Sequence, residues 1–289
     1  MGVCMARNIL RAGMPVRAWN RSPRKAVTLA RDAALIVDSP AATAEGAAIV
    51  VTMLSDVDAV LEVMEGEAGF LSALSASSTL ARSPIWVQMS TIGVPGTERC
   101  AEVAQHRGLR FVDAPVLGSR ELARRGELIV MASGPKELEP ELEPLFAAVG
   151  ERTMWLGPAG AGSALQLVAN SWVITVVEGM AETIALAEGT GVDPRDFLRA
   201  VAGGPLDLPY MQVKAHAILE REFAPSFRLE LAAKDARLVA ETAEEHDLDL
   251  PLLAAVCARI AEGVPQHGDE DMAATYLTSA PLSNGSALS

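Results

Sequence analysis

The sequence is poor in cysteine, histidine and basic residues, and each scarcity argues against a class of protein. Its 289 residues contain three cysteines and four histidines. The cysteines, Cys4, Cys100 and Cys257, are odd in number, lie far apart and show no C-x-x-C spacing, which argues against a disulfide framework or a zinc site. The histidines also lack the spacing of metal ligands. We therefore expect no metal site, and free thiols in a reducing, cytoplasmic compartment.

The shortage of basic residues gives the chain a strong negative charge. Twenty-four lysines and arginines face 37 acidic residues, a formal net charge of −13. Nucleic acids and anionic membranes would be repelled, so we expect neither as a partner and predict a small-molecule substrate. The most apolar long stretch, residues 165–187, is interrupted by Asn170, Glu178 and Glu182 at helical spacing. This pattern indicates a buried helix, not a membrane span.

The pattern of apolar residues changes about halfway along the chain. Before it, short β-branched runs alternate with helical patterns, which predicts a parallel sheet with crossover helices. These predicted strands lie near residues 14–19, 47–54, 84–90, 109–115, 127–133 and 152–157. From Gly160 onward, apolar residues recur at spacings of three and four, as in helices. We therefore predict an α/β fold with a Rossmann-type domain over residues 1–156 and an all-α domain over residues 157–289.

The start of the chain matches a dinucleotide-binding fold only in part. In such a fold the first strand leads into G-x-G-x-x-G, whose glycines let a pyrophosphate approach the N-terminus of the first helix. This sequence supplies one glycine, Gly2, then the helix, the Gly13 turn and the second strand. We expect the first strand to be missing, which would leave unpaired edges on the strands near Val16 and Val50 and lower stability.

The second predicted strand ends in Asn20-Arg21-Ser22, where an NAD-specific fold usually places an acidic residue for the ribose 2′-hydroxyl. An arginine there suits the 2′-phosphate of NADP instead. The alternative is that Arg21 and the nearby Arg24 are solvated loop residues.

Six segments, met in the expected order, resemble motifs of the β-hydroxyacid dehydrogenase family. This family also includes glyoxylate and succinic semialdehyde reductases and, more distantly, imine reductases. The segments are MGVCMARNIL, WNRSPRKA, VTMLSD, MSTIGV, DAPVLGSRELARRGELIVMASG and FRLELAAKDARL, and the stretch GPAGAGSALQLVAN is a further match to a family motif. One such motif alone is a weak signal, whereas their order over nearly the whole chain is specific.

The resemblance implies an NADPH-dependent oxidoreductase that moves a hydride between nicotinamide and a small hydroxy acid or aldehyde. It also implies a homodimer or higher homo-oligomer formed through the helical domain. The cofactor-binding residues that it implies are Gly2, Asn20, Arg21, Ser22, Met53, Leu54, Thr91 and Lys234. The catalytic residues that it implies are Gln166, Asn170 and Ser119.

Two residues depart from the family pattern at the site. Gln166 stands where the family has its catalytic lysine, and Leu117 replaces a serine of the family's substrate segment, which residues 113–134 resemble. A carboxamide can orient a carbonyl group, but it cannot act as a general acid or base. The other proton donors that we consider are Ser119, Arg120, Lys234 and Tyr210.

Alternative interpretations remain open at this stage. Gln166 could be a polar residue on an ordinary surface, and Lys234 with Asp235 a solvated helix pair. The glycines of residues 157–162 fit either a phosphate cradle or a tight entry into a packed helix. For the whole protein, the rivals are an imine reductase or reductive aminase, and a non-catalytic nucleotide-binding or interaction protein.

Overall fold

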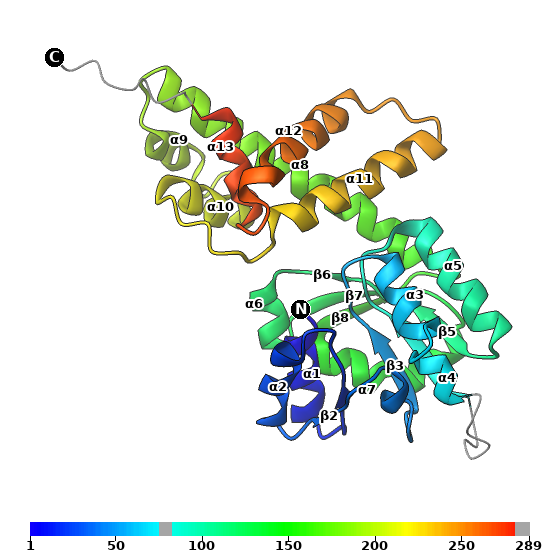
Figure 1. Ribbon diagram of the computed structural model, residues 1–289. Helices are drawn as coiled ribbons and strands as arrows, with labels where there is room; N and C mark the ends of the chain where they lie inside the picture. Colours follow the sequence, from blue (N-terminus) through cyan, green and yellow to red (C-terminus); the bar gives the residue numbers. More distant parts are fainter. Residues whose placement is uncertain (75–82, 281–289) are drawn as a thin grey trace. The chain divides into compact units, whose positions relative to one another are not determined.

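The computed structural model describes residues 1–74 and 83–280, which divide into two compact units. Unit 1 spans Met1–Leu167 and unit 2 spans Val168–Ser289. The long helix α8 (Ala161–Gly189) contributes its first two turns to unit 1 and the remainder to unit 2. Figure 1 shows unit 1 in blue to green, as strands and helices, and unit 2 in green to red, as helices.

The described strands of unit 1 form three small sheets. Their bounds are β1 Arg17–Ala18, β2 Leu35–Ile36, β3 Ile49–Thr52, β4 Ile85–Gln88, β5 Arg110–Asp113, β6 Val116–Leu117, β7 Leu128–Ala132 and β8 Gly150–Trp155. Strands β1–β2, β3–β4–β5 and β7–β8 pair in parallel, whereas β6 pairs antiparallel with β7. Within the described residues no hydrogen-bonded ladder joins β1 to β3.

Helices connect the parallel strands of unit 1. They are α1 Gly2–Arg11, α2 Pro23–Ala30, α3 Val57–Glu65, α4 Phe70–Leu74, α5 Gly93–His106, α6 Arg120–Arg125 and α7 Glu139–Val149, with the short turns η1 Ala41–Thr43 and η2 Lys136–Leu138. The predicted Rossmann-type α/β fold is therefore confirmed. Strands β2 and β6, of two residues each, were not predicted.

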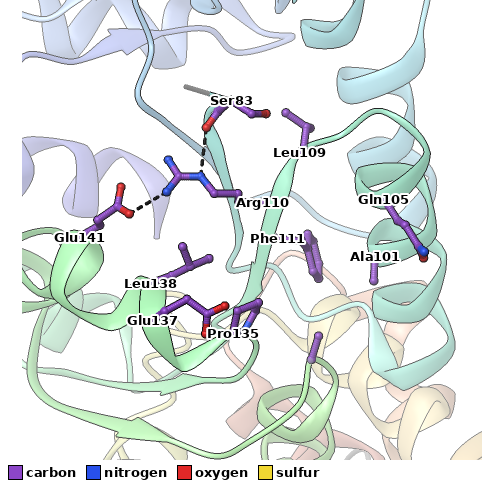
Figure 2. Close-up of a pocket in the computed structure, with 11 residues that line it drawn as sticks. Ser83, Ala101, Gln105, Leu109, Arg110, Phe111, Pro135, Glu137, Leu138 and Glu141 are labelled. Atoms are coloured by element: carbon purple, nitrogen blue, oxygen red, sulfur yellow. Dashed lines mark hydrogen bonds and ion pairs between the residues drawn. The ribbon is translucent and has the colours of Figure 1, made fainter. Parts of the chain in front are cut away.

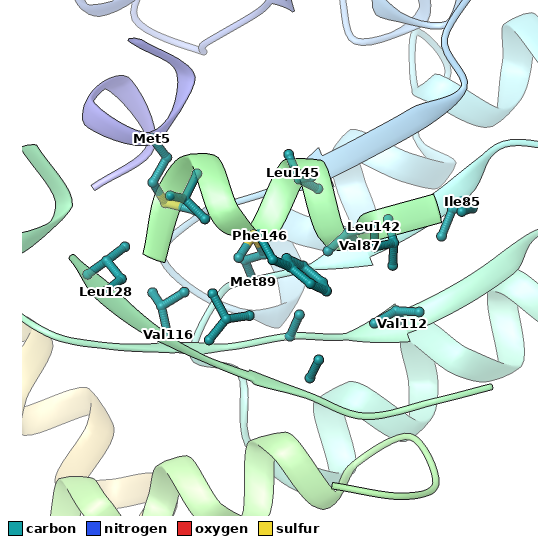
Figure 3. Packing of buried hydrophobic residues seen from close by; sticks show 14 of the residues in the cluster. Met5, Ile85, Val87, Met89, Val112, Val116, Leu128, Leu142, Leu145 and Phe146 are labelled. Carbon is teal, nitrogen blue, oxygen red and sulfur yellow. The ribbon is translucent and has the colours of Figure 1, made fainter. Parts of the chain in front are cut away.

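The sheet β3–β4–β5 packs against a hydrophobic core on each face, since successive side chains of its strands point to opposite faces. Ile85 and Val87 of β4 face a core that includes residues of α1 and α7, whereas Trp86 faces a core that includes residues of α3 and α5. Figure 3 shows the first of these cores, with Phe146 of α7 close to the sheet residues. A sheet buried on both faces explains why these strands are almost continuously apolar.

The described part of unit 2 is helical. After α8 come α9 Pro194–Val201, α10 Pro209–Leu219, α11 Leu229–Glu245, α12 Pro251–His267, η3 Met272–Thr275 and α13 Tyr276–Ser279. By length and composition, α8 is apolar enough to cross a membrane. Its residues Met180, Ala181 and Ile184, however, pack in the core of unit 2 with residues of α10 and η3, as a buried helix would.

Candidate functional site

The loops that follow β3 and β4 are tied together by a buried polar network. Trp86 Nε1 donates to Thr52 Oγ1 at 3.0 Å, and the Thr52 hydroxyl donates to Gln88 Oε1 at 3.3 Å. Gln88 also bonds both the N–H and the carbonyl of Ser90, each at 2.7 Å. The Ser90 hydroxyl then accepts the Leu54 N–H at 2.8 Å. These bonds fix the backbone shape of both loops at the carboxyl ends of the strands, where α/β folds bind ligands.

Two of the predicted cofactor-binding residues lie in the loop after β3, and a third in the loop after β4. Met53 and Leu54 follow β3, and Thr91 follows β4. Gly2 begins α1, and a Cβ added to it would lie 3.7 Å from Met53. The structure therefore brings Gly2, Met53 and Leu54 close together. No close approach in this structure requires a glycine at position 2, because 3.7 Å is an ordinary contact.

The first turn of α1 fits a negatively charged group. It contains no acidic residue, and no side chain caps it. A helix N-terminus presents unsatisfied N–H groups and a partial positive charge, which together attract anions. These features fit the pyrophosphate of a dinucleotide.

The predicted ribose-side residues form a turn after β1. The Asn20 side chain accepts the Ser22 N–H at 2.9 Å, so these two residues shape the turn. Arg21 is exposed. In residues 1–74 and 83–280, neither Arg21 nor Arg24 forms an ion pair, whereas Arg17 pairs with Glu45. The turn thus presents two unneutralised guanidinium groups.

Gln166 is buried and directed at the backbone of the substrate segment. Its side chain is 5% exposed, and Nε2 donates to the Val116 carbonyl at 3.0 Å. Val116 and the half-buried Leu117 form β6. Ser119, the third predicted catalytic residue, is the N-cap of α6, and its hydroxyl accepts the Leu122 N–H at 3.3 Å. In this structure both side chains bond backbone groups, Gln166 one that lies 50 residues away in the chain and Ser119 one that lies three residues away.

A buried carboxylate that the sequence analysis did not single out lies close to the start of α8. Asp113 ends β5 and is fully buried. It accepts the Ser163 N–H and the Ser163 hydroxyl, both at 2.8 Å, and the Ser133 hydroxyl at 3.2 Å. Burial raises the pKa of Asp113 to about 6, although these hydrogen bonds act in the opposite direction.

The predicted residues of unit 2 form a second polar cluster. Asn170 on α8 donates from Nδ2 to Asp235 Oδ2 at 2.9 Å, and Lys234 Nζ lies 2.8 Å from Asp235 Oδ1. Burial raises the pKa of Asp235, and the Lys234 ammonium opposes this shift. The structure thus brings Asn170 and Lys234 together through a carboxylate, so the pair is not the solvated helix pair of the alternative interpretation.

Tyr210, another proton donor that we considered, serves in packing. Its hydroxyl lies 3.7 Å from Met272 Sδ, and its ring lies 5.2 Å from Lys214 Nζ. Burial raises the pKa of Tyr210 far above its usual range. Lys214 is itself buried and paired with Asp271. This cluster joins α10 to the segment before η3.

A cavity of about 760 Å³ lies elsewhere on unit 1 (Figure 2). Residues of α5, β5 and the η2–α7 segment line it, and Arg110 at its wall donates to the Ser83 carbonyl and to Glu141. None of the predicted site residues lines this cavity. It therefore adds nothing to the candidate site.

The sequence analysis missed the buried polar residues that support the site: Gln88 and Ser90 after β4, and Asp113, Ser133 and Ser163 around the start of α8. A polar residue at the end of each apolar strand was the available signal. Their partners lie up to 66 residues away in the chain, so no local spacing reveals the pairing.

Family models match both parts of the chain. Residues 1–157 match the NAD binding domain of 6-phosphogluconate dehydrogenase. Residues 160–278 match the NAD-binding domain of NADP-dependent 3-hydroxyisobutyrate dehydrogenase.

Two curated relatives align over most of their length. An uncharacterised oxidoreductase, YfjR, of Bacillus subtilis is 30% identical over 277 residues, which cover 95% of this chain and 94% of the relative. Glyoxylate/succinic semialdehyde reductase 1 of Arabidopsis thaliana is 29% identical over 255 residues, which cover 88% of this chain and 86% of the relative.

Solved structures agree with these relatives. The 3-hydroxyisobutyrate dehydrogenase of Mycobacterium tuberculosis, solved with L-serine, has a TM-score of 0.83 and 25% identity, with 96% of this chain and 95% of that chain covered. An imine reductase of Myxococcus stipitatus with NADP⁺ shares the fold, with a TM-score of 0.64, 18% identity and 96% of each chain covered. From its sequence motifs, its fold and these matches, the chain belongs to the β-hydroxyacid dehydrogenase family of NAD(P)-dependent oxidoreductases.

Proposed function

We propose that this protein binds NADPH and reduces a small carbonyl compound, or oxidises the matching hydroxy acid, and that it does so as a homo-oligomer. The observation that carries the choice of NADPH is Arg21, exposed and without an ion-pair partner in the described residues, at the turn after β1. A guanidinium group pairs well with a phosphate dianion, whereas NAD has no phosphate there. The uncapped first turn of α1 supports the same assignment.

The nicotinamide supplies the hydride when the cofactor is bound, and the chain's own residues must supply the proton for the substrate oxygen. Gln166 cannot serve, because a carboxamide does not titrate. Ser119 caps α6, Arg120 carries a guanidinium group, which is not a general acid, and burial raises the pKa of Tyr210, which makes its phenol a weaker acid. Lys234 remains as the donor that we assign, and its Nζ is held 2.8 Å from Asp235 Oδ1.

Asn170 then holds the substrate. One of its Nδ2 hydrogens is directed at Asp235, which fixes the orientation of the carboxamide. The remaining hydrogen and the carbonyl oxygen are available for a substrate hydroxyl or carboxylate.

Imine reduction is the second candidate, and Gln166 favours it. A protonated C=N group already carries the positive charge that a catalytic lysine would otherwise supply to a carbonyl, so a neutral residue is compatible with that chemistry. The fold shared with the Myxococcus imine reductase is consistent with this candidate but does not distinguish it.

The test has two parts: NADPH binding followed by fluorescence, and NADPH oxidation with small aldehydes, 2-oxo acids and cyclic imines. Turnover of aldehydes or 2-oxo acids, lowered at least tenfold in Lys234→Met but not in the exposed control Lys136→Met, supports the proposal. Turnover of imines alone supports the second candidate. Tight NADPH binding without any turnover contradicts both and indicates a non-catalytic binding protein.

A further inference from the structure

Two hydrogen-bonded pairs join the start of α8 to the substrate segment, and the pairs are three residues apart in both segments. Asp113 bonds Ser163, and Val116 bonds Gln166. Residues 113 to 116 and residues 163 to 166 are therefore held side by side. Both pairs belong to unit 1, so this arrangement does not depend on how the units are placed.

The first of these pairs is the centre of a larger buried cluster, which we call the Asp113 latch: Asp113, Ser163, Ser133 and Thr97. The Ser163 hydroxyl lies 2.8 Å from the Thr97 hydroxyl of α5, and the Ser133 hydroxyl accepts the Gly162 N–H at 2.9 Å. Ser133 also exchanges both backbone hydrogen bonds with Asp113, at 3.0 and 2.7 Å. The latch thus joins β5, the end of β7, α5 and α8.

The start of α8 packs closely against the backbone at the Asp113 latch. A Cβ at Gly162 would lie 2.1 Å from the Met131 carbonyl oxygen and 3.2 Å from Asp113 Oδ2. Only glycine permits this approach. This close approach lets the Gly162 N–H reach the Ser133 hydroxyl and the Ser163 N–H reach the Asp113 carboxylate, which satisfies donors that a helix start otherwise leaves unpaired.

We propose that Asp113 is a positioning residue, whose carboxylate holds the first turn of α8 in the place from which the helix presents Gln166 and Asn170 to the substrate. The proposal rests on the proposed function in one respect, that a substrate binds beside Gln166 and Asn170. Whether Asp113 holds the start of the helix can be measured without turnover. We assign Asp113 no contact with cofactor or substrate, because it acts through its hydrogen bonds to Ser163.

The latch accommodates a neutral residue of the same shape. Asparagine at position 113 can accept the Ser163 N–H through its oxygen and donate to the Ser163 hydroxyl, which then donates to Thr97. Leucine at that position offers no acceptor, so the Ser163 N–H and hydroxyl lose their partner in a buried place. Asp113→Asn and Asp113→Leu therefore separate hydrogen bonding from packing.

The carboxylate gives the latch a defined pH response. The titratable group that faces it is the Cys100 thiol of α5, and burial raises the pKa of that thiol to about 12, so it stays neutral. The other groups around it are the hydroxyls of Ser133, Ser163 and Thr97. Opening the helix start exposes Asp113 to water and returns its pKa from about 6 towards 3.8. Protonation therefore favours the closed latch, and opening becomes about tenfold rarer between pH 7 and pH 5.

Hydrogen–deuterium exchange of the peptide spanning residues 160–170, corrected for intrinsic rates, tests the proposal on the full chain. We expect the protection of this peptide in the wild type to rise about tenfold from pH 7 to pH 5. In Asp113→Asn the peptide should be protected at both pH values, without that rise. In Asp113→Leu its protection should fall at least tenfold. Asp193→Asn, which changes the acidic N-cap of α9 in the other unit, is the matched control and leaves this peptide unchanged.

Wild-type-like protection in Asp113→Leu, or a wild-type peptide whose protection falls at pH 5, overturns the proposal. If Asp113→Leu does not fold, Ser163→Ala serves in its place, because it removes one donor to Asp113 and should lower the protection of the peptide severalfold. Unchanged protection in Ser163→Ala would also overturn the proposal. With a turned-over carbonyl substrate, Asp113→Leu should raise KM and lower kcat, with rescue by Asp113→Asn and unchanged NADPH affinity. If no substrate is turned over, the proposed function fails while the exchange result still decides the role of Asp113.

Discussion

Gln166 donates a hydrogen bond of 3.0 Å from Nε2 to the carbonyl oxygen of Val116. Gln166, which the resemblance places at the family's lysine position, is thus bound to the backbone of residues 113–134, with 5% of its surface exposed. This contact gives the glutamine a structural reason to be there. It does not supply a proton.

Replacing Gln166 with lysine should increase turnover of carbonyl substrates. The ammonium group would provide an acid near the substrate oxygen, and general acid–base catalysis contributes about 10²–10⁴ in rate. We expect a gain of roughly ten- to hundredfold in kcat, because the lysine must also give up the Val116 contact and remain charged in a mostly buried place. Steady-state rates of NADPH oxidation on aldehydes and 2-oxo acids measure it.

Gln166→Met is the matched control for that substitution. It keeps the length of the side chain and removes the hydrogen bond, so it should show no gain. Equal gains in the two variants would mean that loss of the Val116 contact, and not the ammonium group, is responsible. High activity of the unmodified protein on imines, lost in Gln166→Lys, would favour the imine reductase.

Substituting Arg21 with aspartate should change the cofactor preference. The carboxylate repels the 2′-phosphate of NADPH and can accept the ribose hydroxyls of NADH. We expect the Kd of NADPH to rise at least tenfold while that of NADH stays within a few fold, as measured by fluorescence titration. Arg31→Asp makes the same charge change at the other end of α2. If it weakens NADPH as much as Arg21→Asp does, general electrostatics and not a specific contact is responsible.

The long-range organisation of this protein was accessible from the sequence where apolar residues recur over many positions. The stretch 165–187 predicted a buried helix, and α8 spans Ala161–Gly189. The run 84–90 predicted a strand, and β4 spans Ile85–Gln88. The helix shows apolar residues at helical spacing, whereas the strand, buried on both faces, shows a short continuous apolar run, and both patterns are readable without the fold.

The supporting contacts of the site were not accessible, for a physical reason. Asp113 and Ser163 are 50 residues apart and meet only because β5 and the start of α8 come together in the folded unit. Gln166 was identified as an anomaly in a motif, but its partner is a backbone carbonyl, which every residue has. Ser119 matched the substrate segment, yet its role as an N-cap depends on where α6 begins.

Two exposed apolar side chains on α8 predict an oligomer interface. Val168 and Trp172 lie one helical turn apart and are 65% and 62% exposed. Large apolar groups next to each other on a surface often mark protein contacts. We expect Trp172→Glu to reduce the molar mass measured by light scattering to that of a smaller assembly. Val27→Glu, at a 56% exposed position in unit 1, should leave the mass unchanged. A wild-type protein that is already monomeric at micromolar concentration would contradict this prediction.

The buried Asp113 should make the stability of the protein depend on pH with a defined sign. Its pKa in the folded state is about 6, above the ordinary value of 3.8. The folded state therefore holds this proton more tightly than the unfolded state, so the favourable contribution is complete below pH 4. It is lost as the pH rises to about 6, and the shift of about two pKa units corresponds to about 3 kcal/mol.

Asp113→Asn removes this titration and keeps the hydrogen-bonding shape of the protonated acid. The free energy of unfolding of the variant minus that of the wild type should therefore increase between pH 4 and pH 7, by up to about 3 kcal/mol. Urea unfolding followed by tryptophan fluorescence at half-unit pH steps measures the difference. Ser163→Ala removes one hydroxyl donor to the Asp113 carboxylate and keeps the backbone N–H, so the pKa of Asp113 in this variant should be higher than in the wild type. A difference that stays flat from pH 4 to pH 7 would show that Asp113 titrates in the folded protein as it does in water.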